Sequence, residues 1–169
     1  MKTAFITGVF GFVGRHLQVY LRENGWKLTG LDLRMSGSSA GFYRSDLHDR
    51  SAVQRALRET RPDVIFHLSG ILKSENAEEY YRAHGFGTMA LFDAVRETDL
   101  KPLIIMASSS AVYGAGLGRR PITERFRPRP LTHYAVSKLA QEMVAMRYHA
   151  AFDLPVICVR MFNLLGPGL

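Results

Sequence analysis

Cysteine is almost absent from this sequence, which has a single one, Cys158, in 169 residues. A lone cysteine cannot form a disulfide within the chain, and the apolar residues around it predict a buried thiol in a strand. No group of cysteine, histidine or acidic residues has the spacing of a metal site. No apolar run is long enough to span a bilayer, and the N-terminal apolar stretch is too short for a signal peptide. These absences favour a cytoplasmic protein with no metal and no membrane partner.

Acidic residues are fewer than basic ones, which leaves a formal net charge of +7. The basic residues are dispersed, except at Arg119, Arg120 and the proline-rich stretch from Arg125 to Pro130. This segment is either a solvated loop or a basic rim on a site for a phosphorylated substrate. Nucleic-acid binding would rest on charge alone, because basic and aromatic residues are not interleaved. We therefore expect no nucleic-acid partner.

Apolar runs alternate with amphipathic segments along the chain. Hydrophobic residues make up 47% and charged residues 22%, as in globular proteins. The length suits one domain over residues 1–169, with a substantial core. Strands are expected at 2–7, 27–33, 42–44, 64–68, 103–107 and 155–160, and helices at 12–23, 49–59, 78–97 and 132–151. This order predicts an α/β fold, a doubly wound parallel sheet of the Rossmann type.

The last residues predict a loop that leaves the sixth strand. The segment from Phe162 to Gly168 contains a Gly-Pro-Gly sequence, and only Leu169 follows it. A protein of this design normally continues beyond such a loop. We therefore expect a C-terminal, substrate-binding part to be missing from this chain.

A glycine-rich turn joins the first expected strand to the first expected helix, in the sequence TGVFGFVG. Gly8 allows the tight turn, Gly11 lets the backbone approach a pyrophosphate, and Gly14 permits close packing of helix and strand. The helix N-terminus then offers free N–H groups and a positive dipole to phosphates. The turn predicts a dinucleotide site that Gly8, Phe10, Gly11, Phe12 and Val13 contact.

Acidic residues after the second and third strands complete this cofactor prediction. Asp32 follows Gly14 by 18 residues, near the spacing of about 20 expected for a carboxylate that binds the adenosine ribose. A carboxylate there favours NAD over NADP, whereas Arg34 could accommodate the extra phosphate of NADP. Asp46 could meet the adenine edge or act as a helix N-cap. We expect NAD, with NADP as the less favoured cofactor.

Tyr134 and Lys138 are four residues apart in an expected helix, so they lie on one face. A phenol with a pKa near 10 is a poor base at neutral pH. A nearby ammonium lowers that pKa, so Tyr134 could take a proton from a substrate hydroxyl and return it. The cluster Ser108–Ser110 follows the fifth strand, at the edge where such sheets bind ligands. The three motifs together predict a redox active site.

These motifs resemble the extended short-chain dehydrogenase/reductases, in the group of NAD-dependent epimerases and dehydratases that modify nucleotide sugars. The resemblance covers essentially the whole chain. It is carried by the glycine turn, Asp46-Leu47, PDVIFHLSG at 62–70, SSSAVYG at 108–114, YAVSK at 134–138, RMFN at 160–163 and GPG at 166–168.

The resemblance implies roles for individual residues. Ser109, Tyr134 and Lys138 would be catalytic, and Lys138 would also hold the nicotinamide ribose. The substrate, a nucleotide-diphosphate sugar, would meet Ser109, Ser110, Tyr134 and Asn163. The remaining cofactor contacts would come from Asp32, Arg34, Asp46, Leu47, Leu68, Ser69 and Gly70. Family members commonly dimerise through two helices per subunit. The resemblance therefore implies a homodimer, with the helices at 78–97 and 132–151 in the interface.

Departures from the family pattern narrow the prediction. The 4,6-dehydratases carry an acidic pair after the catalytic hydroxyl, where this chain has Ser110 and Ala111, so dehydration is not expected. Where the family often has asparagine, this chain has His84, which either replaces the asparagine hydrogen bonds or packs in the core. Packing is the favoured alternative. His67 is expected to be structural, because it ends a buried strand.

Three functions remain open. The favoured one is an NAD-dependent nucleotide-sugar epimerase that works by reversible hydride transfer at a sugar carbinol. The alternative enzyme is a nucleotide-sugar reductase or dehydrogenase, for example one acting on a GDP-4-keto-6-deoxy sugar. The non-enzymatic alternative is a redox sensor that binds a dinucleotide. The presence of both Tyr134 and Lys138 disfavours the sensor.

Overall fold

Six parallel strands form one sheet in the part of the chain that the structure describes, residues 1–37, 39–115 and 121–168 of a computed structural model. The strands are β1 Thr3–Thr7, β2 Lys27–Leu31, β3 Phe42–Tyr43, β4 Val64–His67, β5 Leu103–Ser109 and β6 Val156–Met161. Their order is β3-β2-β1-β4-β5-β6. Successive strands are therefore added on one side of β1 as far as β3 and on its other side from β4 onward, and open α/β sheets bind ligands at such a switch point. This topology confirms the predicted Rossmann-type fold.

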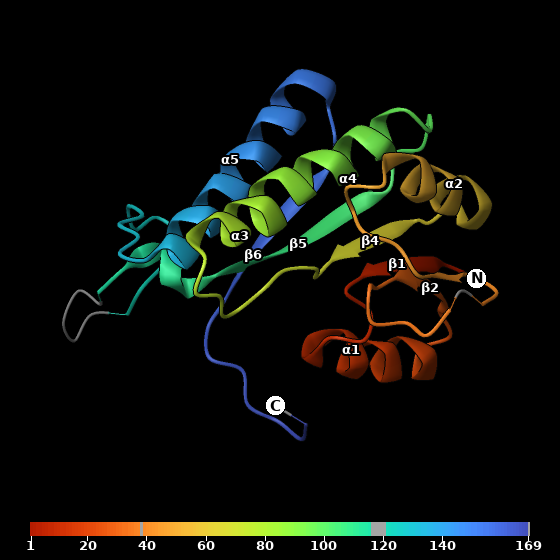
Figure 1. Ribbon diagram of the computed structural model, residues 1–169, viewed down its shortest axis with the longest axis horizontal. Helices are drawn as coiled ribbons and strands as arrows, with labels where there is room; N and C mark the ends of the chain where they lie inside the picture. The colour runs from red at the N-terminus through yellow and green to blue at the C-terminus, as the bar shows by residue number, and fades with distance from the viewer. Residues whose placement is uncertain (38, 116–120, 169) are drawn as a thin grey trace.

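Helices lie on both faces of the sheet (Figure 1). One face carries α1 Phe12–Glu23. The other carries α2 Arg50–Thr60, α3 Ala77–Tyr81, η1 Arg82–Phe86, α4 Gly87–Arg96 and α5 His133–Phe152, while a short 3-10 turn, η2 Ser110–Tyr113, follows β5. Ala4 and Ile6 of β1 pack with Leu21 of α1, whereas Phe5 between them packs with Phe92 of α4. The alternation of strand side chains thus supplies one core to each face.

Capping residues fix where the helices begin. Asp49 accepts a hydrogen bond from the backbone N–H of Ala52 and caps α2, and Thr132 caps α5 by accepting from Ala135. In contrast, Gly11 precedes α1 without a side-chain cap. The first N–H groups of α1 are therefore available to a ligand.

Most element ends differ from the sequence prediction by only one or two residues, and two of the differences concern the site. The helix expected at 78–97 contains a π-helical turn, η1, between α3 and α4. This turn includes the buried His84 and the unhindered Gly85, and π-helical turns of this kind often lie at functional sites. The strand expected to end at Ala107 runs on to Ser109, because Ser108 and Ser109 continue the parallel pairing with β6. Two of the three serines therefore lie in the strand.

Among the described residues, no helix combines the length and the apolar character needed to cross a membrane. Cys158 is half-buried in β6 rather than fully buried, and packs against the edge of the core. Burial raises the pKa of its thiol to about 11, and the negative charge of Glu142 acts in the same direction. The thiol is therefore protonated at neutral pH.

Candidate cofactor and active site

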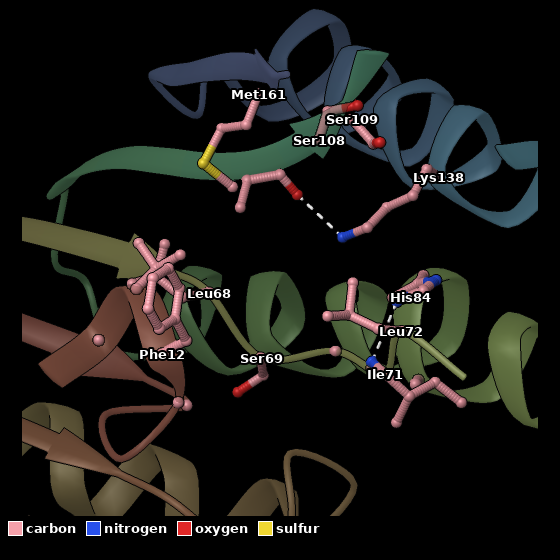
Figure 2. A pocket seen from close by; sticks show the side chains of 18 of the residues that line it. Phe12, Leu68, Ser69, Ile71, Leu72, His84, Ser108, Ser109, Lys138 and Met161 are labelled. Atoms are coloured by element: carbon pink, nitrogen blue, oxygen red, sulfur yellow. Dashed lines mark hydrogen bonds between the residues drawn. The ribbon is translucent and has the colours of Figure 1, made fainter. Parts of the chain in front are cut away.

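A cleft of about 1550 Å³ opens at the carboxyl ends of the strands. In Figure 2, Lys138 extends into it toward the end of β5, opposite the loop that contains Ser69 and Ile71. Nearly all predicted site residues line this cleft: Gly8, Gly11, Phe12, Val13, Asp32, Arg34, Asp46, Leu47, Leu68, Ser69, Gly70, Ser109, Ser110, Tyr134, Lys138 and Asn163. Phe10 is not among the lining residues, and its backbone N–H instead donates to Asp32.

The glycine turn between β1 and α1 leaves no room for side chains at Gly8 and Gly14. Gly8 has a φ of +71° and its N–H donates to the carbonyl of Leu31. A Cβ on Gly14 would lie 2.6 Å from the carbonyl oxygens of Gly8 and Val9. The absence of a side chain at Gly14 thus lets the N-terminus of α1 pack closely against the end of β1. The uncapped helix end and the tight turn fit a pyrophosphate group.

Asp32 lies at the end of β2, with only 5% of its surface exposed. Its carboxylate accepts from the backbone N–H of Phe10 at 2.9 Å and of Arg34 at 2.9 Å. The guanidinium of Arg34 adds two hydrogen bonds, at 3.0 and 2.9 Å. Burial raises the pKa of Asp32, but the hydrogen bonds from Arg34 and Phe10 together lower it below its usual value. Asp32 is therefore a charged acceptor whose partner is Arg34.

Asp46 and Leu47 line the cleft beyond β3. Asp46 accepts from the backbone N–H of His48 at 3.0 Å. The helix N-cap that its sequence position allowed belongs instead to Asp49. Asp46 is therefore a cleft-lining acceptor and not the cap of α2.

Lys138 is 6% exposed and donates to the carbonyl of Ala107 and to the side chain of Gln141, both at 3.0 Å. Burial lowers the pKa of Lys138 to about 8, although the carboxylate of Glu142 acts in the opposite direction. Tyr134 lies one turn earlier on α5, and both side chains line the cleft. Its ring packs edge-on against His84, with 5.6 Å between ring centroids. The helix thus brings phenol and ammonium into one cleft.

The serines differ in their partners. Ser108 is buried and its hydroxyl donates to the carboxylate of Glu142, which also binds Arg160. Ser109 caps η2 by accepting from the backbone N–H of Ala111 at 3.2 Å. Its hydroxyl proton is then free to be donated to a ligand in the cleft. Of the two strand serines, Ser109 is the one suited to stabilise a reacting oxygen.

His84 is both buried and hydrogen-bonded. Its Nε2 accepts from the backbone N–H of Ile71 at 3.2 Å (Figure 2). Its Nδ1 lies 2.8 Å from the hydroxyl of Ser137. The histidine therefore forms hydrogen bonds as well as packing, and it joins the loop after β4 to α5. Burial, followed by the positive charge of Lys138, lowers the pKa of His84 to about 3. The ring is neutral, so Nδ1 carries its proton.

The last described residues fold along the open side of the cleft. Asn163 lines it together with Phe162 and Leu165. The carbonyl of Pro167 lies 3.1 Å from Nε2 of His16 on α1. Of the two interpretations of the basic segment, the cleft lining does not support a basic rim, because Arg125, Arg127 and Arg129 are not among the lining residues. Arg119 and Arg120 lie outside the described residues.

Sequence reasoning missed several residues of this cleft, among them Arg82 of η1 and Met161 of β6. It also missed the buried side chains behind Lys138, which include Gln141. Of these residues, only Gln141 could have been predicted from the sequence, because a residue three positions after Lys138 lies on the same face of the helix. In the described residues, no group of histidine, cysteine and acidic side chains could hold a metal ion.

A model of the NAD dependent epimerase/dehydratase family matches residues 4–168. The chain therefore belongs to this family, as its motifs predicted. It spans about half the length of the curated relatives it matches.

One such relative is the GDP-6-deoxy-D-mannose reductase of Pseudomonas aeruginosa, 31% identical over 171 residues that cover 97% of this chain and 53% of the relative. Among solved structures, the UDP-glucose 4-epimerase of Brucella ovis in complex with NAD has a TM-score of 0.87 at 27% identity and covers 96% of this chain and 52% of its own. RMD of Pseudomonas aeruginosa, complexed with NADPH, has a TM-score of 0.84 at 30% identity. The match covers 99% of this chain and 56% of RMD.

Proposed function

We propose that this chain binds NAD in the cleft and carries the catalytic residues of a nucleotide-sugar epimerase. The observation that carries the proposal is the meeting of two sites in one cleft. The uncapped end of α1 and the carboxylate of Asp32 are suited to a dinucleotide, and Ser109, Tyr134 and Lys138 lie across from them. The resemblance of the chain to NAD-bound and NADPH-bound family members supports this assignment.

The residues present fit the parts of NAD. Backbone N–H groups at the start of α1 would hold the pyrophosphate, Asp32 the adenosine ribose, and Lys138 the nicotinamide ribose. When bound, NAD supplies reversible hydride transfer to and from a carbinol carbon. Asp46 and Leu47 would line the adenine, and Leu68, Ser69 and Gly70 the middle of the cofactor.

Tyr134 is the group that we propose moves the proton. Tyr134 shares the cleft with the ammonium of Lys138, and in the proposed reaction it accepts the proton of a sugar hydroxyl. The hydroxyl of Ser109 donates to the oxygen that becomes a carbonyl. When the reaction reverses, Tyr134 returns the proton to that oxygen. Ser110 and Asn163 would contact other parts of the nucleotide sugar.

The alternative is a reductase of a nucleotide-linked keto sugar, which the 31% identity to a GDP-sugar reductase supports. The two reactions differ in whether the cofactor is consumed. Incubation with UDP- and GDP-sugars, followed by absorbance at 340 nm and chromatography of the sugars, separates them. Isomerised sugar at constant absorbance supports the epimerase, whereas stoichiometric loss of NADH or NADPH with a keto sugar overturns it. The same assay applies to a longer protein that contains this chain.

We also propose that the protein is a cytoplasmic homodimer. Exposed apolar side chains gather on η1, α4 and α5, where Phe86 is 61%, Met143 49% and Met146 60% exposed. A helix face of this kind suits a second copy of the chain. Light scattering after size exclusion should give twice the monomer mass, and Met146→Glu should restore the monomer. A monomeric wild-type protein would contradict the dimer.

A further inference from the structure

A chain of buried polar side chains begins at the ammonium of Lys138. Its Nζ donates to Oε1 of Gln141 at 3.0 Å, and Nε2 of Gln141 donates to Oγ1 of Thr88 at 2.8 Å. Oγ1 of Thr88 lies 2.8 Å from Nε2 of His67, which also lies 3.3 Å from Nε2 of Gln141. Gln141, Thr88 and His67 are each 0% exposed. The contacts therefore join α5, α4 and β4 inside the protein.

The same chain continues to the cofactor side of the cleft. Nδ1 of His67 lies 2.8 Å from Oγ1 of Thr7, the last residue of β1. Oγ1 of Thr7 also accepts from the backbone N–H of Ser69 at 3.2 Å. Thr7 directly precedes the glycine turn at Gly8, and Ser69 lines the cleft. Lys138 is thus connected to both loops that surround the proposed dinucleotide.

Donors and acceptors in this chain have one consistent arrangement. An ammonium can only donate, so Oε1 of Gln141 faces Lys138 and its amide nitrogen faces Thr88 and His67. Because that nitrogen is also a donor, Nε2 of His67 must accept. The proton of His67 is then on Nδ1 and is donated to Thr7. The position of Lys138 therefore determines the direction of every hydrogen bond up to Thr7.

Burial of an amide at this position needs a reason. A buried polar group destabilises the fold unless it is hydrogen-bonded, and an apolar side chain would fill a core-facing helix position at lower cost. The amide of Gln141 supplies Lys138 with an acceptor and at the same time donates to Thr88, so it bridges the two side chains. Among the described residues, Gln141 and the Ala107 carbonyl are the acceptors of Nζ.

We propose that Gln141 is a positioning residue that holds the Lys138 ammonium in the cleft and couples it, through Thr88 and His67, to the loops around the cofactor. The part that concerns the cofactor rests on the proposed function. Gln141 acts through Lys138 and has no place in the cleft lining.

Other charged and titratable groups around Lys138 are accounted for. Glu142 on the same helix is paired with Arg160 from β6. His67 and His84 are neutral, because burial and then the charge of Lys138 lower the pKa of each to about 3. Tyr134 lies one turn away on α5. A new charge at Gln141 would therefore act on Lys138 directly.

The experiment measures the pKa of Lys138 by NMR of protein labelled at lysine Cε, with the signal assigned by its loss in Lys138→Met. Gln141→Glu keeps the shape and should raise that pKa by about one unit or more, because a carboxylate replaces the amide oxygen. Gln141→Met removes the acceptor and should lower the pKa and weaken NADH binding about tenfold. Thr88→Val should weaken NADH binding as well. Its matched control is Thr60→Val, which removes a buried hydroxyl from α2 and should change neither quantity.

Folding is checked by near-UV circular dichroism, and a folded Gln141→Glu with an unchanged Lys138 pKa overturns the proposal. If that variant does not fold, Gln141→Met decides by the same titration, and a folded Gln141→Met with an unchanged Lys138 pKa overturns the proposal. The wild-type protein provides an independent measurement, since the ¹⁵N shifts of His67 must report a proton on Nδ1. A proton on Nε2 overturns the proposal. If wild-type protein binds no NADH but Lys138 responds as expected, the proposed function fails while the positioning role of Gln141 stands.

Discussion

The ammonium of Lys138 lies 3.0 Å from the carbonyl oxygen of Ala107, two residues before Ser109. This hydrogen bond joins α5 to the end of β5. It therefore fixes the position of the Lys138 amine relative to the Ser109 hydroxyl of the proposed active site. It also buries the amine, which is why the lysine loses its proton more readily than lysines on the surface.

The pH dependence of activity should reflect that burial. The pKa of Lys138 is lowered to about 8, so the ammonium that shares the proposed active site with Tyr134 is present below this pH and lost above it. We expect kcat/KM to fall with a basic limb near pH 8. The limb should persist in Lys101→Met, which alters a surface lysine. A profile that stays flat to pH 10 would contradict the role of Lys138.

Tyr134→Phe should separate binding from chemistry. The change removes one hydroxyl and leaves the ring, which packs edge-on against His84 and Tyr80. We expect the dissociation constant of NADH to stay within about threefold, while turnover falls about 100-fold or more through loss of the proton-transfer group. Fluorescence titration and single-turnover assays measure the two effects. Full activity in this variant would rule out the mechanism.

The fold was predictable from local patterns, because each strand and helix is marked by its own periodicity and turn residues. The glycine turn, Asp32 and Tyr134 were predictable for the same reason, since each belongs to a short motif. The π-helical turn at His84 and the pairing of Arg34 with Asp32 were not. Both depend on contacts between segments distant in sequence or on a side-chain orientation that no pattern encodes.

The buried chain behind Lys138 shows this limit most clearly. His67 was expected to be structural and is fully buried. Its partners are Thr7 and Thr88, which are 60 and 21 residues away. Such a network exists only after the sheet and α4 have packed together. Sequence alone identifies the histidine but not the hydrogen bonds that satisfy it.

Gly14→Ala should destabilise the protein, because the new Cβ would lie 2.6 Å from two backbone carbonyl oxygens. Overpacking of this kind costs about 1–3 kcal/mol in the free energy of unfolding. Gly85→Ala is the matched control, since Gly85 is also helical and a Cβ there would meet nothing within 4 Å. It should be neutral or stabilise by up to about 1 kcal/mol. Urea denaturation compares them, and equal effects would contradict the packing of α1 against the glycine turn.

Arg34 should decide how strictly the protein selects its cofactor. Both oxygens of the Asp32 carboxylate accept from the Arg34 guanidinium, whose side chain is 62% exposed. The cation neutralises the carboxylate that would otherwise repel the 2′-phosphate of NADPH. Arg34→Ala should therefore keep or tighten NADH binding and weaken NADPH binding about tenfold or more, and Asp32→Asn should shift the preference the other way. Fluorescence titrations with the two reduced cofactors measure the ratio.

The control for this prediction is Arg22→Ala, which removes a cation from the last turn of α1, away from the cleft. It should leave the ratio of the two dissociation constants unchanged. Loss of the Arg34 hydrogen bonds should also raise the pKa of Asp32, because those bonds lower it in the wild-type protein. The acid limb of NADH binding should then move to higher pH in Arg34→Ala. An unchanged cofactor ratio in that variant would show that Arg34 serves only as the partner of Asp32.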